Sequence, residues 1–290
     1  MNSHPSTIDV ICTSYDSLSD TEKKVADFII HNLDDVAIMS VRDIAIQSGT
    51  SSATVSRFVR RVGYERFSDL RLAIASDQAG VVQEEVPAVN EISLDNIDAS
   101  INYILGNKIQ ELTGTASQLD KASINKAVNL IMDSDTILFA AVGNSIPVCS
   151  NFAFRLNQIG MRTNCPANTE LMILASLSLH SNDLVIIVSS SGYSHRLETI
   201  FDNAEDSDTP ILFITSNSAS ILAKRADVVL IAVSRDKLLT GHQFATHVPE
   251  DFIVETLFMF LLAHGKNVSE YVRMEKKSLG KDKENLPTFN

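Results

Sequence analysis

Four short segments after residue 135 are made almost entirely of apolar residues, and helical patterns separate them. They are residues 136–142, 184–188, 211–215 and 228–233. A strand without polar alternation must be covered on both faces, which is the situation of strands in a parallel sheet. Because helices alternate with these strands, the pattern predicts an α/β domain with a parallel sheet flanked by helices.

Small polar residues follow three of these predicted strands. Gly143, Asn144 and Ser145 follow the first, the sequence Ser-Ser-Ser-Gly-Tyr-Ser at 189–194 follows the second, and residues 215–218 end the third. Ligands of open α/β sheets bind beyond the carboxyl ends of the strands. Hydroxyl and backbone N–H donors ahead of a helix N-terminus suit a phosphate. The three loops together favour a phosphorylated polyol, whereas any one alone also fits an ordinary turn.

The first 77 residues show a different pattern, with three helical segments close together. Capping-box signatures open the first two, from Ser19 to Glu22 and from Ser40 to Asp43, and Gly49 ends the second. A short helix, a turn containing glycine and a second short helix form the helix-turn-helix pattern.

The third of these helices carries a local excess of positive charge. Residues 54–71 contain five arginines and two acidic residues, a net of 5 − 2 = +3 in a chain of formal net charge −12. Arginine recognises guanine edges and phosphates, and hydroxyls near a helix N-terminus contact phosphates. The alternative is a solvated cationic face, but the charge excess coincides with the turn, which favours DNA binding with Thr54, Arg57 and Arg61 on one outward face. The predicted DNA-binding residues are Ser40, Ser51, Ser52, Thr54, Arg57, Arg60 and Arg61.

In segments 40–45, 53–58, 63–64 and 67–70 the N-terminal region resembles the RpiR/MurR family of bacterial transcriptional regulators. The second region resembles the SIS (sugar isomerase) fold through the three strand-end loops. The resemblance implies a homodimer or higher homo-oligomer on a palindromic operator, which represses genes of sugar or amino-sugar catabolism. It also implies a sugar-phosphate effector, with an N-acetyl amino-sugar phosphate as one candidate. It implies that the hydroxyls of Ser145, Ser189, Ser191 and Ser194 bind the sugar phosphate, and that Ser190 and Gly192 shape the loop and supply N–H groups. Asn144 is a further predicted ligand-binding residue.

Two acidic residues are further candidates for ligand binding. Relatives often carry histidine where this chain has Glu170, so this residue could discriminate among sugars, although a helix N-terminal acid is an equally good interpretation. Glu250 is a second candidate, and with His242 and His247 it could also supply a general base. The alternative function is therefore a sugar-phosphate isomerase with an accessory N-terminal domain. We predict a regulator and no enzyme, because isomerisation gives the arginine-rich helix no role.

Composition divides the chain into four parts. We expect a helix-turn-helix domain at 1–77, an acidic linker at 78–96, a SIS domain at 97–272 and a polar tail at 273–290. No apolar segment approaches the roughly 20 residues that span a bilayer, and the first ten residues lack a signal-peptide pattern. The three cysteines lack metal-site spacing. We expect a cytoplasmic protein with no membrane partner, metal or cofactor.

Overall fold

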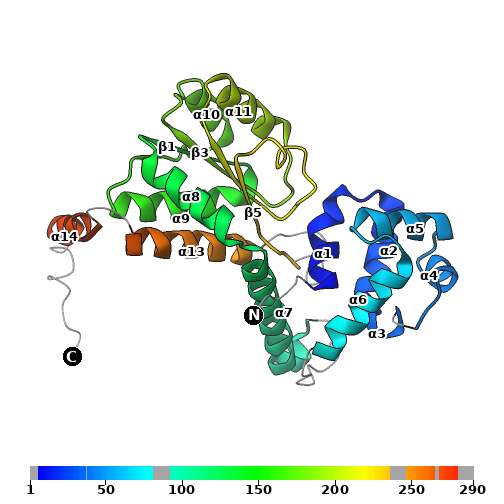
Figure 1. The fold of residues 1–290 in the computed structure, drawn as a ribbon. Helices are drawn as coiled ribbons and strands as arrows, with labels where there is room; N and C mark the ends of the chain where they lie inside the picture. The colour runs from blue at the N-terminus through cyan, green and yellow to red at the C-terminus, as the bar shows by residue number, and fades with distance from the viewer. Residues whose placement is uncertain (1–5, 37, 81–91, 236–245, 265–267, 280–290) are drawn as a thin grey trace, which may run out of the picture.

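The computed structural model describes residues 6–36, 38–80, 92–235, 246–264 and 268–279. A helical N-terminal domain lies beside an α/β domain, and the long helix α7 (Ile97–Gln118) runs down from the α/β domain alongside the helical one (Figure 1). No helix within these ranges is long and apolar enough to cross a membrane.

The helical domain is built from short helices around one apolar core. Both predicted capping boxes are confirmed: Glu22 bonds to Ser19, and Asp43 bonds to Ser40. Gly49 has a φ of 65° in the turn before the third predicted helix, a conformation that glycine adopts without strain. A first helix, α1, was not predicted. The elements are α1 (Thr7–Ser14), η1 (Tyr15–Ser17), α2 (Asp20–His31), α3 (Leu33–Val36), α4 (Val41–Gln47), α5 (Ser52–Arg61) and α6 (Phe67–Gly80).

The α/β domain contains a five-stranded parallel sheet in the order β2-β1-β3-β4-β5, which confirms the predicted fold class. All four predicted strands are present, and the short edge strand β2 was missed because two residues carry no readable pattern. The strands are β1 (Ile137–Ala141), β2 (Thr163–Asn164), β3 (Leu184–Ser189), β4 (Ile211–Thr215) and β5 (Val228–Ile231). The remaining elements are η2 (Leu94–Asn96), α8 (Lys121–Asp133), η3 (Gly143–Ser145), α9 (Ile146–Gln158), α10 (Thr169–Ser176), α11 (His195–Asp206), α13 (Val248–His264) and α14 (Val268–Leu279).

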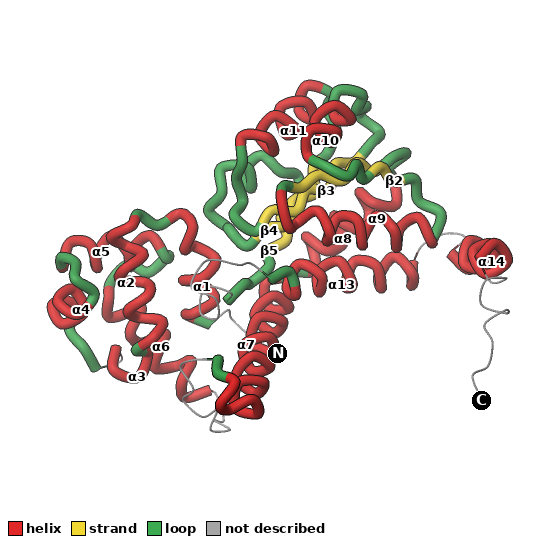
Figure 2. The backbone as a smooth tube through the Cα atoms, turned by 180° about the vertical axis from the view of Figure 1, so that it is seen from behind, coloured by secondary structure: helices red, strands yellow, loops and turns green. Residues whose placement is uncertain are grey.

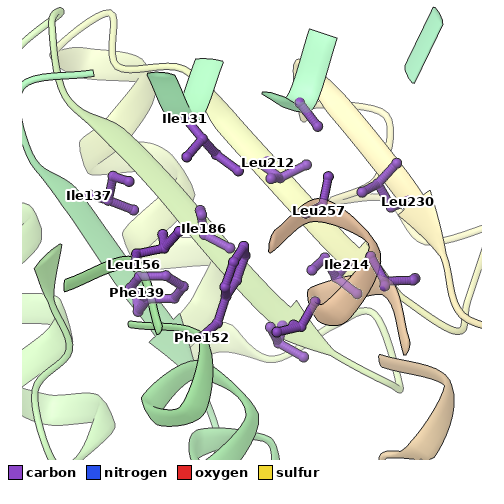
Figure 3. Close-up of a cluster of buried hydrophobic side chains, with 14 of the residues drawn as sticks. Ile131, Ile137, Phe139, Phe152, Leu156, Ile186, Leu212, Ile214, Leu230 and Leu257 are labelled. Carbon is purple, nitrogen blue, oxygen red and sulfur yellow. The ribbon is translucent and has the colours of Figure 1, made fainter. Parts of the chain in front are cut away.

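Helices cover both faces of the sheet, as its apolar strands require. Helices α8, α9 and α13 pack on one face, where Phe139 and Phe152 meet edge to face at 5.6 Å (Figure 3). Helices α10 and α11 cover the other face, where Leu138 and Val185 lie among the buried residues. Alternate residues of each central strand therefore enter different cores. Because β1, β3 and β4 are parallel, their carboxyl ends lie at one edge of the sheet.

The elements cross two of the predicted domain boundaries. Helix α6 continues to Gly80, three residues beyond the predicted end of the first domain, and α14 spans the predicted start of the tail. Residues 81–91 of the predicted linker and 280–290 of the tail lie outside the described residues. The four-part division of the chain stays a prediction.

Candidate functional site

The loop after β3, residues 189–194, is a tight turn that leads into the N-terminus of α11. The Ser189 hydroxyl and carbonyl both accept the Gly192 N–H, at 3.2 and 3.1 Å. Gly192 has a φ of 79°, which favours glycine, and Ser194 caps α11 by accepting the Arg196 N–H at 3.2 Å. The predicted loop therefore leads into the positive end of a helix dipole, where negative charge is favoured.

Residues after β4 hold this loop in place with side-chain hydrogen bonds to its carbonyls. The Asn217 side chain donates to the Ser191 carbonyl at 3.0 Å, and the Ser220 hydroxyl donates to the Gly192 carbonyl. A Cβ on Gly192 would lie 2.8 Å from the Cβ of Ser220. Ser220 lies outside the predicted site, whereas Asn217 belongs to the third strand-end loop, for which the sequence left a ligand contact and an ordinary turn both open. The available signal was their position after the third strand, which the parallel sheet brings next to the loop.

Glu250 reaches the same loop from the first turn of α13. Its buried carboxylate accepts the hydroxyl of Ser190 at 2.6 Å and that of Ser216 at 3.3 Å. His247 Nδ1 lies 3.7 Å from the same carboxylate oxygen. The structure thus joins two predicted site residues, Ser190 and Glu250, which are 60 positions apart. Because Glu250 is fully buried and accepts hydrogen bonds from two hydroxyls, we expect it to fix the position of the loop.

The remaining predicted ligand residues lie at the same edge of the sheet. Ser145 is buried in η3 directly after β1, and the neighbouring Asn144 is exposed. The Thr169 hydroxyl donates to the Ala141 carbonyl at 2.8 Å and fixes the N-terminus of α10 against the end of β1. Glu170 follows it, and its carboxylate lies 3.0 Å from Arg196 Nη1, two residues after Ser194.

On α5, the structure exposes most of the predicted DNA-binding residues but corrects one. Arg57, Arg60, Arg61 and Ser52 are exposed, as expected. The outward placement of Thr54 is wrong, because this residue is only 5% exposed. Within the first turn of α5, Thr54 is buried beside Val55, and its hydroxyl lies 3.0 Å from Ser51 Oγ and accepts from Arg57 Nη2 at 3.3 Å. Thr54 therefore supports Arg57. Ser51 and Ser40 are the N-caps of α5 and α4.

Glu22 at the start of α2 lies in the field of this arginine cluster. Burial raises the pKa of its carboxyl, and hydrogen bonds from the Ser19 N–H and hydroxyl lower it. The charges of Arg61 and Arg57 lower it further, so the pKa of Glu22 lies below its usual value of 4.5. The ionised carboxylate thus links the cap of α2 electrostatically to the exposed arginines of α5.

The lowered pKa predicts that Glu22 stabilises the helical domain in a pH-dependent way. A depressed folded-state pKa contributes stability that is complete above pH 4.5 and is lost as the pH falls through the folded value. We expect Glu22→Gln to cost about 0.5–2 kcal/mol of unfolding free energy near pH 7, the usual cost of losing a cap, and progressively less in acid. Urea unfolding of both proteins at several pH values measures this.

The exposed Glu65 provides a control with the same change of charge. We expect Glu65→Gln to change the unfolding free energy by less than about 0.5 kcal/mol, as is usual for surface substitutions. A Glu22→Gln cost that stayed constant from pH 7 to pH 3 would contradict the electrostatic role of Glu22.

Together, the fold and the two sites define a helix-turn-helix domain whose helix α5 bears exposed arginines, joined to an α/β domain with a serine-rich loop at 189–194 before a helix N-terminus. Comparison with known families agrees with this class. The family described as "Helix-turn-helix domain, rpiR family" matches residues 7–80, and the SIS domain family matches residues 130–249. The chain is an RpiR-family helix-turn-helix domain joined to a SIS domain, which confirms the resemblance found in the sequence.

Individual relatives align with most of the chain or with its second domain. An uncharacterized HTH-type transcriptional regulator of Clostridium perfringens is 23% identical over 238 residues, 82% of this chain and 85% of the relative. The solved structure of Vibrio vulnificus NanR complexed with ManNAc-6P is 26% identical, with a TM-score of 0.58, over 94% of this chain and 98% of that one. The sugar isomerase domain of an RpiR transcription factor from Sphaerobacter thermophilus is 24% identical, covers 62% of this chain and 97% of that one, and has a TM-score of 0.55. The chain thus has the domain organisation of an HTH-type transcriptional regulator with a sugar-phosphate-binding SIS domain.

Proposed function

We propose that the protein is a bacterial repressor of genes for sugar or amino-sugar catabolism, and that a sugar phosphate bound at the 189–194 loop releases it from DNA in the cytoplasm. The observation that carries the proposal is the loop itself. Its serines and a glycine at positive φ precede the N-terminus of α11, an arrangement that binds phosphate groups. The exposed arginines of α5 supply the DNA-binding output.

The effector we favour is an N-acetyl amino-sugar 6-phosphate. The support is the relative NanR, whose solved structure holds ManNAc-6P and aligns over nearly the whole of both chains. We also propose a homodimer or larger homo-oligomer, because a helix-turn-helix protein reads a two-fold operator with two modules. We further propose that Glu170 and Arg196, which form an ion pair beside the loop, contact the sugar and so select among sugar phosphates.

A thermal-shift experiment tests the effector class. ManNAc-6P at about 100 times its Kd should stabilise the full chain by about 2.7 kcal/mol, and unphosphorylated ManNAc at the same concentration should have no effect. Ser191→Ala should reduce the shift, since the exposed Ser191 side chain is part of the loop. Ser278→Ala on α14 is the matched control, because this exposed hydroxyl bonds to a carbonyl of its own helix.

Two outcomes would count against this function. If no member of a panel of hexose, pentose and amino-sugar phosphates raised the melting temperature, the loop would not be an effector site. If the purified chain interconverted one of these sugar phosphates at rates usual for enzymes, on the order of 1–1,000 per second, it would be an isomerase.

A further inference from the structure

Helix α1 is buried between the two domains and contacts both. Ile11 is 0% exposed and belongs to the core of the helical domain, and Val10 packs against that core. Asp9 and Thr13, on the same helix, bond to residues of the α/β domain. Figures 1 and 2 both place α1 on the side of the helical domain that faces the α/β domain. Any rearrangement of the two domains must therefore alter the contacts of α1.

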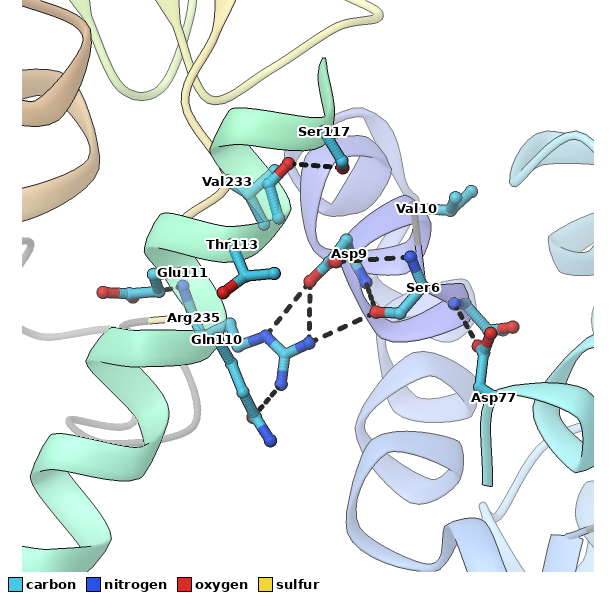
Figure 4. Close-up of polar contacts among 12 residues, drawn as sticks. Ser6, Asp9, Val10, Asp77, Gln110, Glu111, Thr113, Ser117, Val233 and Arg235 are labelled. Carbon is cyan, nitrogen blue, oxygen red and sulfur yellow. Dashed lines mark hydrogen bonds and ion pairs between the residues drawn. The ribbon is translucent and has the colours of Figure 1, made fainter. Parts of the chain in front are cut away.

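The first contact of α1 is a buried ion pair. Arg235, four residues after β5, is 5% exposed, and its Nη2 and Nε lie 2.7 and 3.1 Å from Asp9 Oδ1. Nη2 also donates to Ser6 Oγ at 3.2 Å, and Nη1 donates to Gln110 of α7 (Figure 4). All three guanidinium nitrogens thus have partners. Separation of the domains would leave both charges without this compensation, which is costly for buried ions.

Helix α7 shapes the seat of this ion pair. A Cβ on Gly114 would lie 2.8 Å from Asp9 Oδ2, so glycine is what lets the carboxylate approach α7. The fully buried Glu111 of α7 accepts the backbone N–H of Arg235 at 2.6 Å. The position of Arg235 is therefore fixed by the α/β domain, and α1 docks onto it.

The second contact of α1 adjoins the candidate ligand loop. The Thr13 carbonyl, in the last turn of α1, accepts the Ser218 backbone N–H at 3.3 Å. The preceding residue is Asn217, whose side chain holds the Ser191 carbonyl at 3.0 Å. Ser191 therefore contacts Asn217, and the next residue, Ser218, contacts α1.

We propose that α1 transmits the state of the 189–194 loop to the DNA-binding domain, and that the Arg235–Asp9 pair is the lock that holds one arrangement of the two domains. The proposal rests on the proposed function for the identity of the two ligands. A ligand that displaces Ser191 moves the 217–218 backbone, changes how α1 docks and so shifts the population of locked molecules. Arg235 and Asp9 are positioning residues, because the ion pair that they form joins the two domains.

Hydrogen exchange of the full chain without any ligand tests the lock itself. Arg235→Lys keeps the charge but loses the guanidinium fork. We expect the amides of α1 to exchange about tenfold faster in this variant, while those of α9 keep their protection. Arg225→Lys is the matched control, because Arg225 pairs with Asp202 and Glu205 of α11. Unchanged exchange of α1 in Arg235→Lys, or equal acceleration in Arg225→Lys, would overturn the lock.

The transmission is tested by the ratio of DNA affinities measured with and without ManNAc-6P. The DNA probe is a duplex selected by the full chain from a random-sequence pool. In Arg235→Lys and Asp9→Asn we expect this ratio to fall at least about fivefold towards one, with no further loss in the double variant, because both act through one contact. Gly114→Ala, which displaces the Asp9 carboxylate without removing a charge, should act in the same direction.

The two proposals fail in different ways. If the wild-type chain showed no response to any sugar phosphate, the proposed function would be wrong, and the exchange of α1 would still decide whether the lock exists. If the wild type responded and both single variants kept the wild-type ratio, α1 would not be the transmitting element.

Discussion

Arg57→Ala is expected to weaken binding to the selected DNA duplex by about 1–3 kcal/mol per module, which is roughly 5- to 150-fold in Kd. The reason is the placement of the side chain: Arg57 is exposed on α5, and the buried Thr54 hydroxyl accepts from its Nη2 at 3.3 Å. A side chain held in this way loses less rotamer freedom when it binds. Fluorescence anisotropy at fixed salt measures the loss, because phosphate contacts make every DNA affinity depend on salt.

Arg225→Ala is the control for this loss, since it removes the same charge from the α/β domain. It should leave DNA affinity within about twofold, because a single distant charge is screened beyond a Debye length of about 8–10 Å. In Arg57→Ala, ManNAc-6P affinity in the absence of DNA should be unchanged. Equal losses of DNA and sugar-phosphate affinity would contradict the division of the chain into a reader and a sensor.

Gly192→Ala is expected to have the largest effect on the sugar-phosphate site. At a φ of 79°, alanine is strained, and the added Cβ would lie 2.8 Å from the Cβ of Ser220 and 3.0 Å from that of Asn217. The loop can then no longer pack against the side chains of Asn217 and Ser220. We expect a cost of about 2 kcal/mol, or roughly 30-fold in the Kd for ManNAc-6P. Isothermal titration calorimetry measures this loss.

Gly106→Ala is the matched control, since an added Cβ in this part of α7 meets no atom within 4 Å. It should leave ligand affinity unchanged and stabilise the helix by up to about 1 kcal/mol. The Gly192→Ala protein should still bind DNA, but the sugar phosphate should no longer release it. Ligand affinity equal to that of the wild type would remove the 189–194 loop from the site.

Much of the fold could be read from local pattern. The apolar segments predicted β1, β3, β4 and β5, because a strand buried on both faces has no polar alternation. The capping boxes at Ser19 and Ser40 predicted helix starts, because a cap needs only a hydroxyl and an acid three residues apart. The loop at 189–194 was readable for the same reason: its glycine and its hydroxyls are adjacent in the chain.

Features that depend on contacts between distant segments were not readable. Helical spacing puts Thr54 on the face of Arg57 and Arg61, but the packing of α5 against α2 and α4 buries it. Glu250 could be suggested only as a candidate, and its contact with Ser190 depends on where α13 begins relative to the sheet.

The sequence by itself determined the class of each domain and the position of the phosphate-type loop, because both follow from patterns only a few residues long. The tertiary structure alone decided how the domains are joined. Asp9, Gly114 and Arg235 meet in one buried cluster, although no periodicity relates them. This ion pair is buried because α1, α7 and the segment after β5 together exclude water from it, and the pattern of any one segment does not show that the other two lie beside it.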